Sequence, residues 1–96
     1  MQVQHSRQGN KGHFFVETDH VLLADMVYTM AGTSTMIIEH TEVSDELRGK
    51  NAGYQLVSTA VAYARKNKIR IIPLCPFANS LFKKQPDFSD VLAPKN

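Results

Sequence analysis

The feature that most constrains this chain is the segment VSDELRGKNAG, residues 43–53, which joins an apolar strand to an amphipathic helix through a basic turn. The first turn of a helix has backbone N–H groups without an intrahelical partner, and the helix dipole places positive charge there. Gly49 and Gly53 leave room for a ligand near that backbone, and Asn51 tolerates a left-handed conformation. The segment therefore predicts a pocket for a phosphate or pyrophosphate.

Hydrophobic periodicity predicts the order strand, strand, strand, helix, strand, helix. The strands are expected at residues 13–17, 20–30, 35–43 and 69–75, with a hairpin turn at 31–34 and a helix from residue 53. The last of these strands is nearly continuous in apolar residues, which predicts burial on both faces. Residues 1–9 are polar and are expected to be frayed. The pattern indicates one α+β domain over residues 1–96, with a mixed, mostly antiparallel sheet, a β-α-β crossover and a C-terminal helix.

Composition narrows the class of protein. The chain has 96 residues and 43% hydrophobic content, enough for one small domain with a single core. It contains no apolar run of about 20 residues and no signal peptide, so we expect a cytoplasmic protein without a membrane partner. The net charge of +2 is too small and too dispersed to indicate nucleic acid. The histidines lack metal-ligand spacing, and no metal is expected.

The turn lacks the Gly-Lys-Ser/Thr ending of a P-loop and the three-glycine run of a Rossmann site. It resembles the acyl-CoA pyrophosphate loop of the GNAT superfamily of N-acetyltransferases, whose pattern is Gln/Arg-x-x-Gly-x-Gly/Ala. Arg48 and Gly53 fill the first and last positions, and Asn51 stands where the middle glycine is usual. The resemblance implies an acetyl-CoA site made by Glu42, Val43, Ser44, Arg48, Gly49, Lys50, Asn51, Ala52, Gly53 and Asn79.

The second half of the chain extends the resemblance to about residues 13–92. Pro73 lies inside a predicted strand, so either this strand is at the edge of the sheet or its neighbour diverges from it. In GNAT proteins the corresponding strands splay apart, and the pantetheine arm of CoA lies in the gap. The motifs HTEV (40–43) and PLCPF (73–77) resemble small, single-domain bacterial members. Phe82 occupies the place where many members carry a Tyr that protonates the departing CoA thiolate.

Two side chains before the turn are candidate general bases. Alternation from Met36 predicts Ile38, His40 and Glu42 on one face of their strand. An amine is protonated in water and must lose a proton before it attacks a thioester, and either His40 or Glu42 can accept it. The alternatives are a structural hydrogen bond for His40 and an ion pair with Arg48 or Lys50 for Glu42.

Cys75 is the third catalytic candidate and the only cysteine of the chain. It ends the strand that follows the helix, where sites of parallel sheets gather. The thiol could accept the acetyl group as a nucleophile, or replace the missing Tyr as an acid. The alternative is a small buried hydrophobe without chemistry.

The resemblance thus implies an acetyl-CoA-dependent N-acetyltransferase. The opening helices of the family are missing, which favours a bulky amine acceptor such as a protein N-terminus or lysine, or completion of the site by a second subunit. We expect a monomer or weak homodimer. The competing hypothesis is a non-catalytic module that binds CoA, an acyl-CoA or a partner protein.

Overall fold

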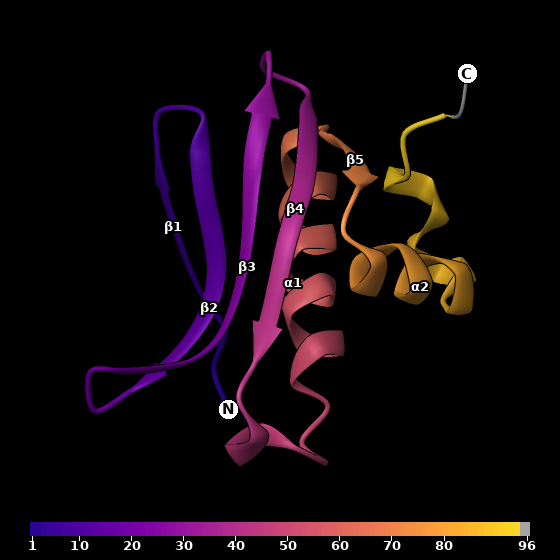
Figure 1. Ribbon diagram of the computed structural model, residues 1–96. Coiled ribbons are helices and arrows are strands. Elements are labelled where there is room, and N and C mark those ends of the chain that lie inside the picture. The colour runs from indigo at the N-terminus through magenta and orange to yellow at the C-terminus, as the bar shows by residue number, and fades with distance from the viewer. Residues whose placement is uncertain (95–96) are drawn as a thin grey trace.

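Five strands form one sheet in the order β1-β2-β3-β4-β5 (Figure 1). They are β1 (Gln4–Gln8), β2 (Lys11–Thr18), β3 (Val21–Ala31), β4 (Thr35–Val43) and β5 (Arg70–Pro73). All neighbouring pairs are antiparallel except β4 and β5, which are parallel. The computed structural model describes residues 1–94. The α+β class and the mixed, mostly antiparallel sheet are confirmed.

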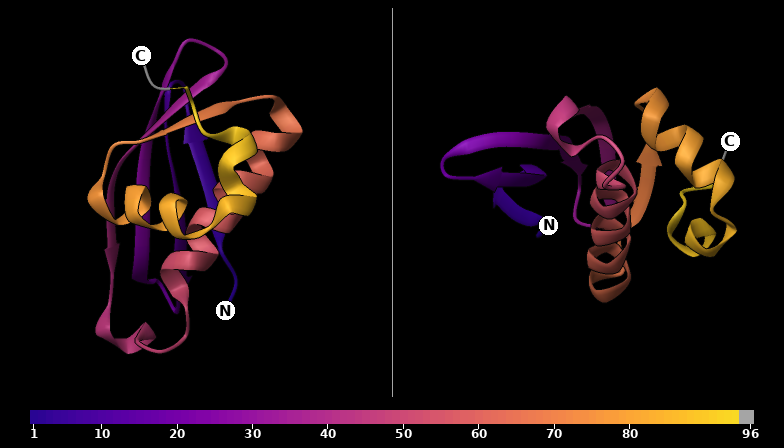
Figure 2. Two further views of the ribbon diagram at one scale, coloured as in Figure 1. Left: turned by 90° about the vertical axis from the view of Figure 1, so that its right-hand side faces the viewer. Right: turned by 90° about the horizontal axis from the view of Figure 1, so that it is seen from below.

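The helices come after β4 in the chain. Between β4 and β5 lie the short 3₁₀ helix η1 (Asp45–Leu47) and the helix α1 (Ala52–Asn67), which makes the crossover of the β-α-β unit. The chain ends with α2 (Pro76–Lys84) and the 3₁₀ helix η2 (Pro86–Val91). In Figure 2, α1 lies against one face of the sheet, while α2 and η2 lie beyond β5.

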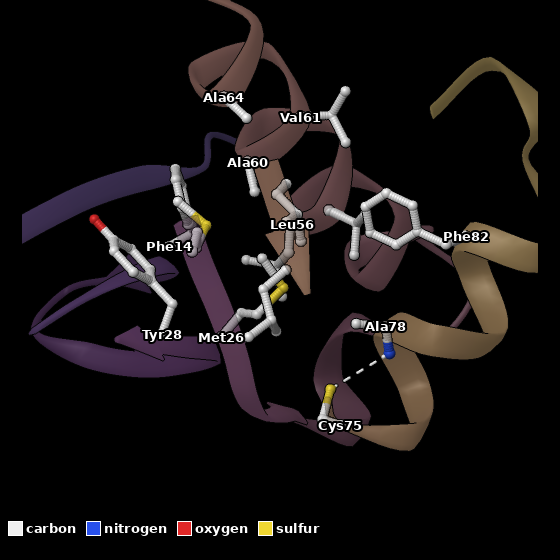
Figure 3. Close-up of a cluster of buried hydrophobic side chains, with 14 of the residues drawn as sticks. Phe14, Met26, Tyr28, Leu56, Ala60, Val61, Ala64, Cys75, Ala78 and Phe82 are labelled. Carbon is white, nitrogen blue, oxygen red and sulfur yellow. Dashed lines mark hydrogen bonds between the residues drawn. The ribbon is translucent and has the colours of Figure 1, made fainter. Parts of the chain in front are cut away.

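The core lies between α1 and this face of the sheet. The apolar stripe of α1 is fully buried, as its helical spacing predicts: Leu56, Val57, Ala60, Val61 and Ala64. Opposite this stripe the strands contribute large buried side chains, among them Phe14, Met26 and Tyr28 (Figure 3). One face of a five-stranded sheet and one helix therefore make the single core that the composition predicts.

The expectation that residues 1–9 are frayed is wrong for β1. Gln4 to Gln8 pair with Phe15 to Lys11 of β2 along the edge of the sheet. The segment is polar because most of it is exposed, and it is held by ladder hydrogen bonds that no hydrophobic pattern reveals. Its anchor is His5, whose ring stacks on Phe14 with centroids 4.1 Å apart and whose Nε2 lies 2.6 Å from the Tyr28 hydroxyl.

The strand expected at residues 69–75 is shorter and less buried than its apolar sequence indicates. β5 ends at Pro73, and only one sheet face of this region is covered, so Ile71 is buried whereas Ile72 and Leu74 are 38% and 66% exposed. Leu92 forms a parallel bridge with Ile71 and closes the edge of the sheet beside β5. Within residues 1–94, no helix is long and apolar enough to cross a membrane.

Candidate functional site

A gap between β4 and β5 is the centre of the candidate site. The parallel pairing ends at Ile38 and Pro73, although β4 continues to Val43. The amides of Leu74 and Cys75 both donate to the Ile38 carbonyl at 3.0 Å, and the chain then turns into α2. Because Pro73 has no N–H, it is suited to the last position of an edge strand. Beyond Ile38, β4 thus presents one edge of its backbone to a gap instead of to a strand.

A β-bulge in β4 changes which side chains face this gap. Val27 pairs with His40 and the next residue, Tyr28, pairs with Ile38, which leaves Glu39 as the extra residue. The extra residue reverses the alternation, so Ile38 is buried under α1 while His40 points to the opposite face. The expectation that Ile38, His40 and Glu42 share one face is therefore wrong for Ile38. It holds for His40 and Glu42.

His40 and Glu42 form a pair on the uncovered face of the sheet. His40 Nε2 lies 2.7 Å from Glu42 Oε1, and the two side chains are 61% and 76% exposed. The alternative of an ion pair between Glu42 and Arg48 or Lys50 is not what forms. Arg48 instead contacts Asp45, with 2.9 Å between Nη2 and Oδ1.

The turn before α1 has the backbone that its sequence predicts. Gly49 and Asn51 have positive φ angles of 80° and 60°, and Asn51 precedes the first residue of α1 without capping it through its side chain. The first hydrogen bond of the helix runs from the Gln55 amide to the Asn51 carbonyl at 3.1 Å. The preceding amides of the first turn therefore have no intrahelical acceptor and are suited to bind an anion. Arg48 and Lys50 are exposed beside them.

One wall of this turn comes from α2. A Cβ on residue 53 would overlap Cζ of Phe77, so the Phe77 ring rests directly on the first turn of α1. Gly49, by contrast, has nothing within 4 Å of an added Cβ, so the turn is open on that side. The space beside Gly53 is thus taken by Phe77, and the expectation that Gly53 leaves room for a ligand is wrong. The contact is not predictable from the sequence because the two residues lie far apart in the chain.

Cys75 lies at the end of the gap and is the N-cap of α2. Its Sγ accepts a hydrogen bond from the Ala78 amide at 3.4 Å (Figure 3) and lies 3.3 Å from Oγ1 of Thr41 on β4. The residue is 6% exposed. Thr41 is on the opposite face of β4 from His40 and Glu42, because neighbouring strand residues alternate. The thiol and the two candidate bases therefore flank β4 from opposite faces.

Two further predicted residues lie on α2. The Asn79 amide donates to the Pro73 carbonyl at 3.4 Å and so joins α2 to the end of β5. Phe82 is buried and contacts Phe88 edge-to-face, with ring centroids 5.9 Å apart. Its ring belongs to the core and offers no proton donor to the gap. Within residues 1–94, no His, Cys, Asp and Glu side chains gather in threes as a metal site needs.

The amino-acid sequence matches the GCN5-related N-acetyl-transferase family over residues 13–91. The chain belongs to this family. The matched segment runs from β2 to the end of η2 and thus contains the turn before α1, the gap and Cys75. Membership confirms the family resemblance that the Arg48–Gly53 turn indicated, and with it the N-acetyltransferase class.

Solved structures agree with this assignment. A GCN5-like candidate N-acetyltransferase from Staphylococcus aureus is 31% identical, with a TM-score of 0.74 over 97% of this chain and 90% of that one. A ribosomal-protein-alanine N-acetyltransferase from Brucella melitensis shares the fold at 14% identity, with a TM-score of 0.62 over 91% of this chain and 64% of that one. An aminoglycoside N-acetyltransferase in complex with CoA is 11% identical, with a TM-score of 0.56 over 80% and 67%. No protein of curated function matches the chain.

Proposed function

We propose that this protein transfers the acetyl group of acetyl-CoA to an amine at the gap between β4 and β5. The observation that carries the proposal is the end of strand pairing at Ile38 and Pro73, which leaves the edge of β4 free as far as Val43. Family membership supports the reaction class. The free edge of β4 has backbone N–H and C=O groups that can bond to the amides of the pantetheine arm of CoA. The turn before α1 has backbone amides and basic side chains that can bind the phosphates of CoA.

We assign the phosphates to the Arg48–Gly53 turn. Gly49 and Asn51 turn the backbone into left-handed conformations there, and space around Gly49 is open. Arg48 pairs with Asp45, and this exposed pair is weak enough to be exchanged for a phosphate. The chain that connects the gap to this turn contains Glu42, Val43 and Ser44. Asn79 of α2 borders the gap where β5 ends.

The chemistry needs a base on one side of the thioester and a proton donor on the other. The acceptor ammonium loses a proton to Glu42 or His40, and the amine then attacks the thioester carbonyl. A C–N bond forms and the C–S bond breaks, and the sulfur leaves as a thiolate. We assign the proton that this thiolate takes up to Cys75, since Phe82 has none to give and the thiol flanks β4 on the face opposite the base. The nitrogen loses its second proton as the amide forms, and this proton restores the Cys75 thiol through solvent.

Measuring the release of CoA with a panel of amines tests the proposal directly. CoA is measured by chromatography, because a reagent for thiols would also react with Cys75. Glu42→Gln should lower the rate about 10²- to 10⁴-fold, the range for loss of a general base. The matched control is Glu46→Gln, because Glu46 is an exposed acid of η1 outside the gap. Acetyl-CoA binding without CoA release from any amine would contradict transfer and favour a CoA-binding module.

A further inference from the structure

The face of the sheet opposite α1 is covered by no helix of residues 1–94, and its side chains form three cross-strand rows. The rows read across β2, β3 and β4 as Phe15, Asp25, Glu42, then His13, Val27, His40, and finally Lys11, Thr29, Ile37. We call these nine residues the open face. Phe15, Val27 and Ile37 are half-buried, so an apolar floor runs between the charged groups. The open face includes the candidate bases and is continuous with the gap.

The acidic residues of the chain are concentrated in the part that builds this face. Residues 11–47, which include all nine residues of the open face, contain seven of the nine acidic residues and one basic residue, Lys11, a formal charge of −6 in a chain whose total is +2. The acids are Glu17, Asp19, Asp25, Glu39, Glu42, Asp45 and Glu46. Within residues 1–94, the other basic residues lie before this segment, in the turn after it, and on or directly after α1, β5 and α2. The small net charge therefore conceals a strong separation, contrary to the expectation that the charge is dispersed.

The carboxylates of the open face are not neutralised by fixed cations. Asp25 and Glu42 are direct cross-strand neighbours, and each contacts a histidine: His13 Nδ1 lies 2.6 Å from Asp25 Oδ1, and His40 lies beside Glu42. These histidines balance the carboxylates only when they are protonated. The one permanent cation of the face, Lys11, is already paired with a neighbouring acid, Glu39 of the bulge, at 3.4 Å.

We propose that the open face binds the acceptor as an extended peptide that contains lysine or arginine, an inference that rests on the proposed function. Charge complementarity selects a cationic partner, and the apolar floor suits the aliphatic stems of its side chains. The hollows along the face hold about 290 Å³ beside His13 and Val27 and about 180 Å³ beside Asp25 and Glu42. Neither is large enough to enclose a drug-sized ligand, whereas an extended chain can cross both.

The arrangement also separates the two substrates by charge. The phosphates of acetyl-CoA are assigned to the basic turn that contains Arg48 and Lys50, at the start of α1. The open face lies on the opposite side of β4 from α1, so the acidic surface for the peptide and the basic turn for the phosphates lie apart. The target amine reaches the gap from the face that bears His40 and Glu42.

The test is an NMR titration of the full chain, without acetyl-CoA, using a nine-residue peptide of alternating lysine and alanine blocked at both ends. We expect shifts at His13, Phe15, Asp25, Val27 and Glu42, with an affinity that falls as salt rises. Asp25→Asn keeps the shape of the side chain and should weaken binding about two- to fivefold, the range for one exposed ion pair. The control Asp87→Asn removes the same charge from exposed η2 and should leave the affinity unchanged.

Three results would overturn the inference: no shifts on the open face, equal binding of the matching glutamate peptide, or spermidine binding as tightly as the lysine peptide. The last would assign the face to a small polyamine. A parallel titration with acetyl-CoA separates this inference from the proposed function. If acetyl-CoA shifts the turn before α1 but the peptide does not bind, the peptide surface is wrong and the function stands. If the peptide binds and acetyl-CoA does not, the surface is supported and the function fails.

Discussion

At the scale of single residues, Cys75 combines a capping role with a position beside the gap. Its sulfur accepts from the Ala78 amide and contacts the Thr41 hydroxyl. Serine is a preferred N-cap residue, so the hydroxyl of Cys75→Ser can accept the same amide hydrogen and pair with Thr41. Cys75→Ser and Cys75→Ala therefore separate capping from chemistry, because both remove the thiol and only Cys75→Ser keeps the cap.

We predict that Cys75→Ser unfolds at a urea midpoint close to that of the natural protein, whereas Cys75→Ala loses about 0.5–2 kcal/mol with the cap. Both variants should lower acetyl transfer by at least about 10²-fold if the thiol is the proton donor. Full activity of folded Cys75→Ala would contradict the chemical role and leave His40 and Glu42 as the candidates. An acetyl group on Cys75, found by intact-protein mass after incubation with acetyl-CoA alone, would identify a nucleophile instead of an acid.

At the scale of elements, the contact between α1 and α2 fixes the wall of the phosphate turn. Phe77 rests on Gly53, so the first turns of the two helices meet where the Phe77 ring fills the space that a side chain at position 53 would take. The ring is 42% exposed, and its far end is the part nearest Gly53. The Phe77 ring can therefore move outward at a moderate cost in free energy when a Cβ at position 53 fills the space beside it.

We predict that Gly53→Ala destabilises the protein by about 1 kcal/mol, at the low end for overpacking because the ring can move. In a Phe77→Ala background the same substitution should cost nothing or stabilise α1, since Ala is the better helix former. Urea unfolding of the four proteins gives the interaction energy. Additive effects of the two substitutions would show that the ring does not lie on Gly53 in solution.

At the scale of the whole molecule, the parts predictable from sequence are those with a local signal. Glycine and asparagine marked the turn before α1, and apolar spacing marked the helix, because both depend on residues close in the chain. The bulge at Glu39 left no such mark, since one extra residue is defined only by its pairing with β3. For the same reason β1 was missed, as its hydrogen bonds are made to β2.

The site shows the same division between local and distant information. The turn residues and Cys75 were predicted from their motifs. Their contacts with Phe77 and Thr41 were not predicted, because each contact joins two elements that lie far apart in the chain. The Asp25–His13 pair of the open face was missed because the two residues meet only across a strand pair. The charge separation could have been read from the sequence, since it needs only the distribution of acidic residues along the chain.

An NMR titration of the ¹⁵N-labelled chain with acetyl-CoA tests directly whether the turn before α1 and the end of β4 bind this cosubstrate. We predict saturable shifts of the amides of residues 48–54 in the turn and of 42–44 at the end of β4. Arg48→Ala should weaken binding about ten- to a hundredfold, because charge-assisted bonds contribute about 1.5–3 kcal/mol. Lys66→Ala, which removes one exposed positive charge from the far end of α1, is the control and should bind as the natural protein does. Unmoved amides at 48–54 under saturating acetyl-CoA would show that this turn does not bind the phosphates.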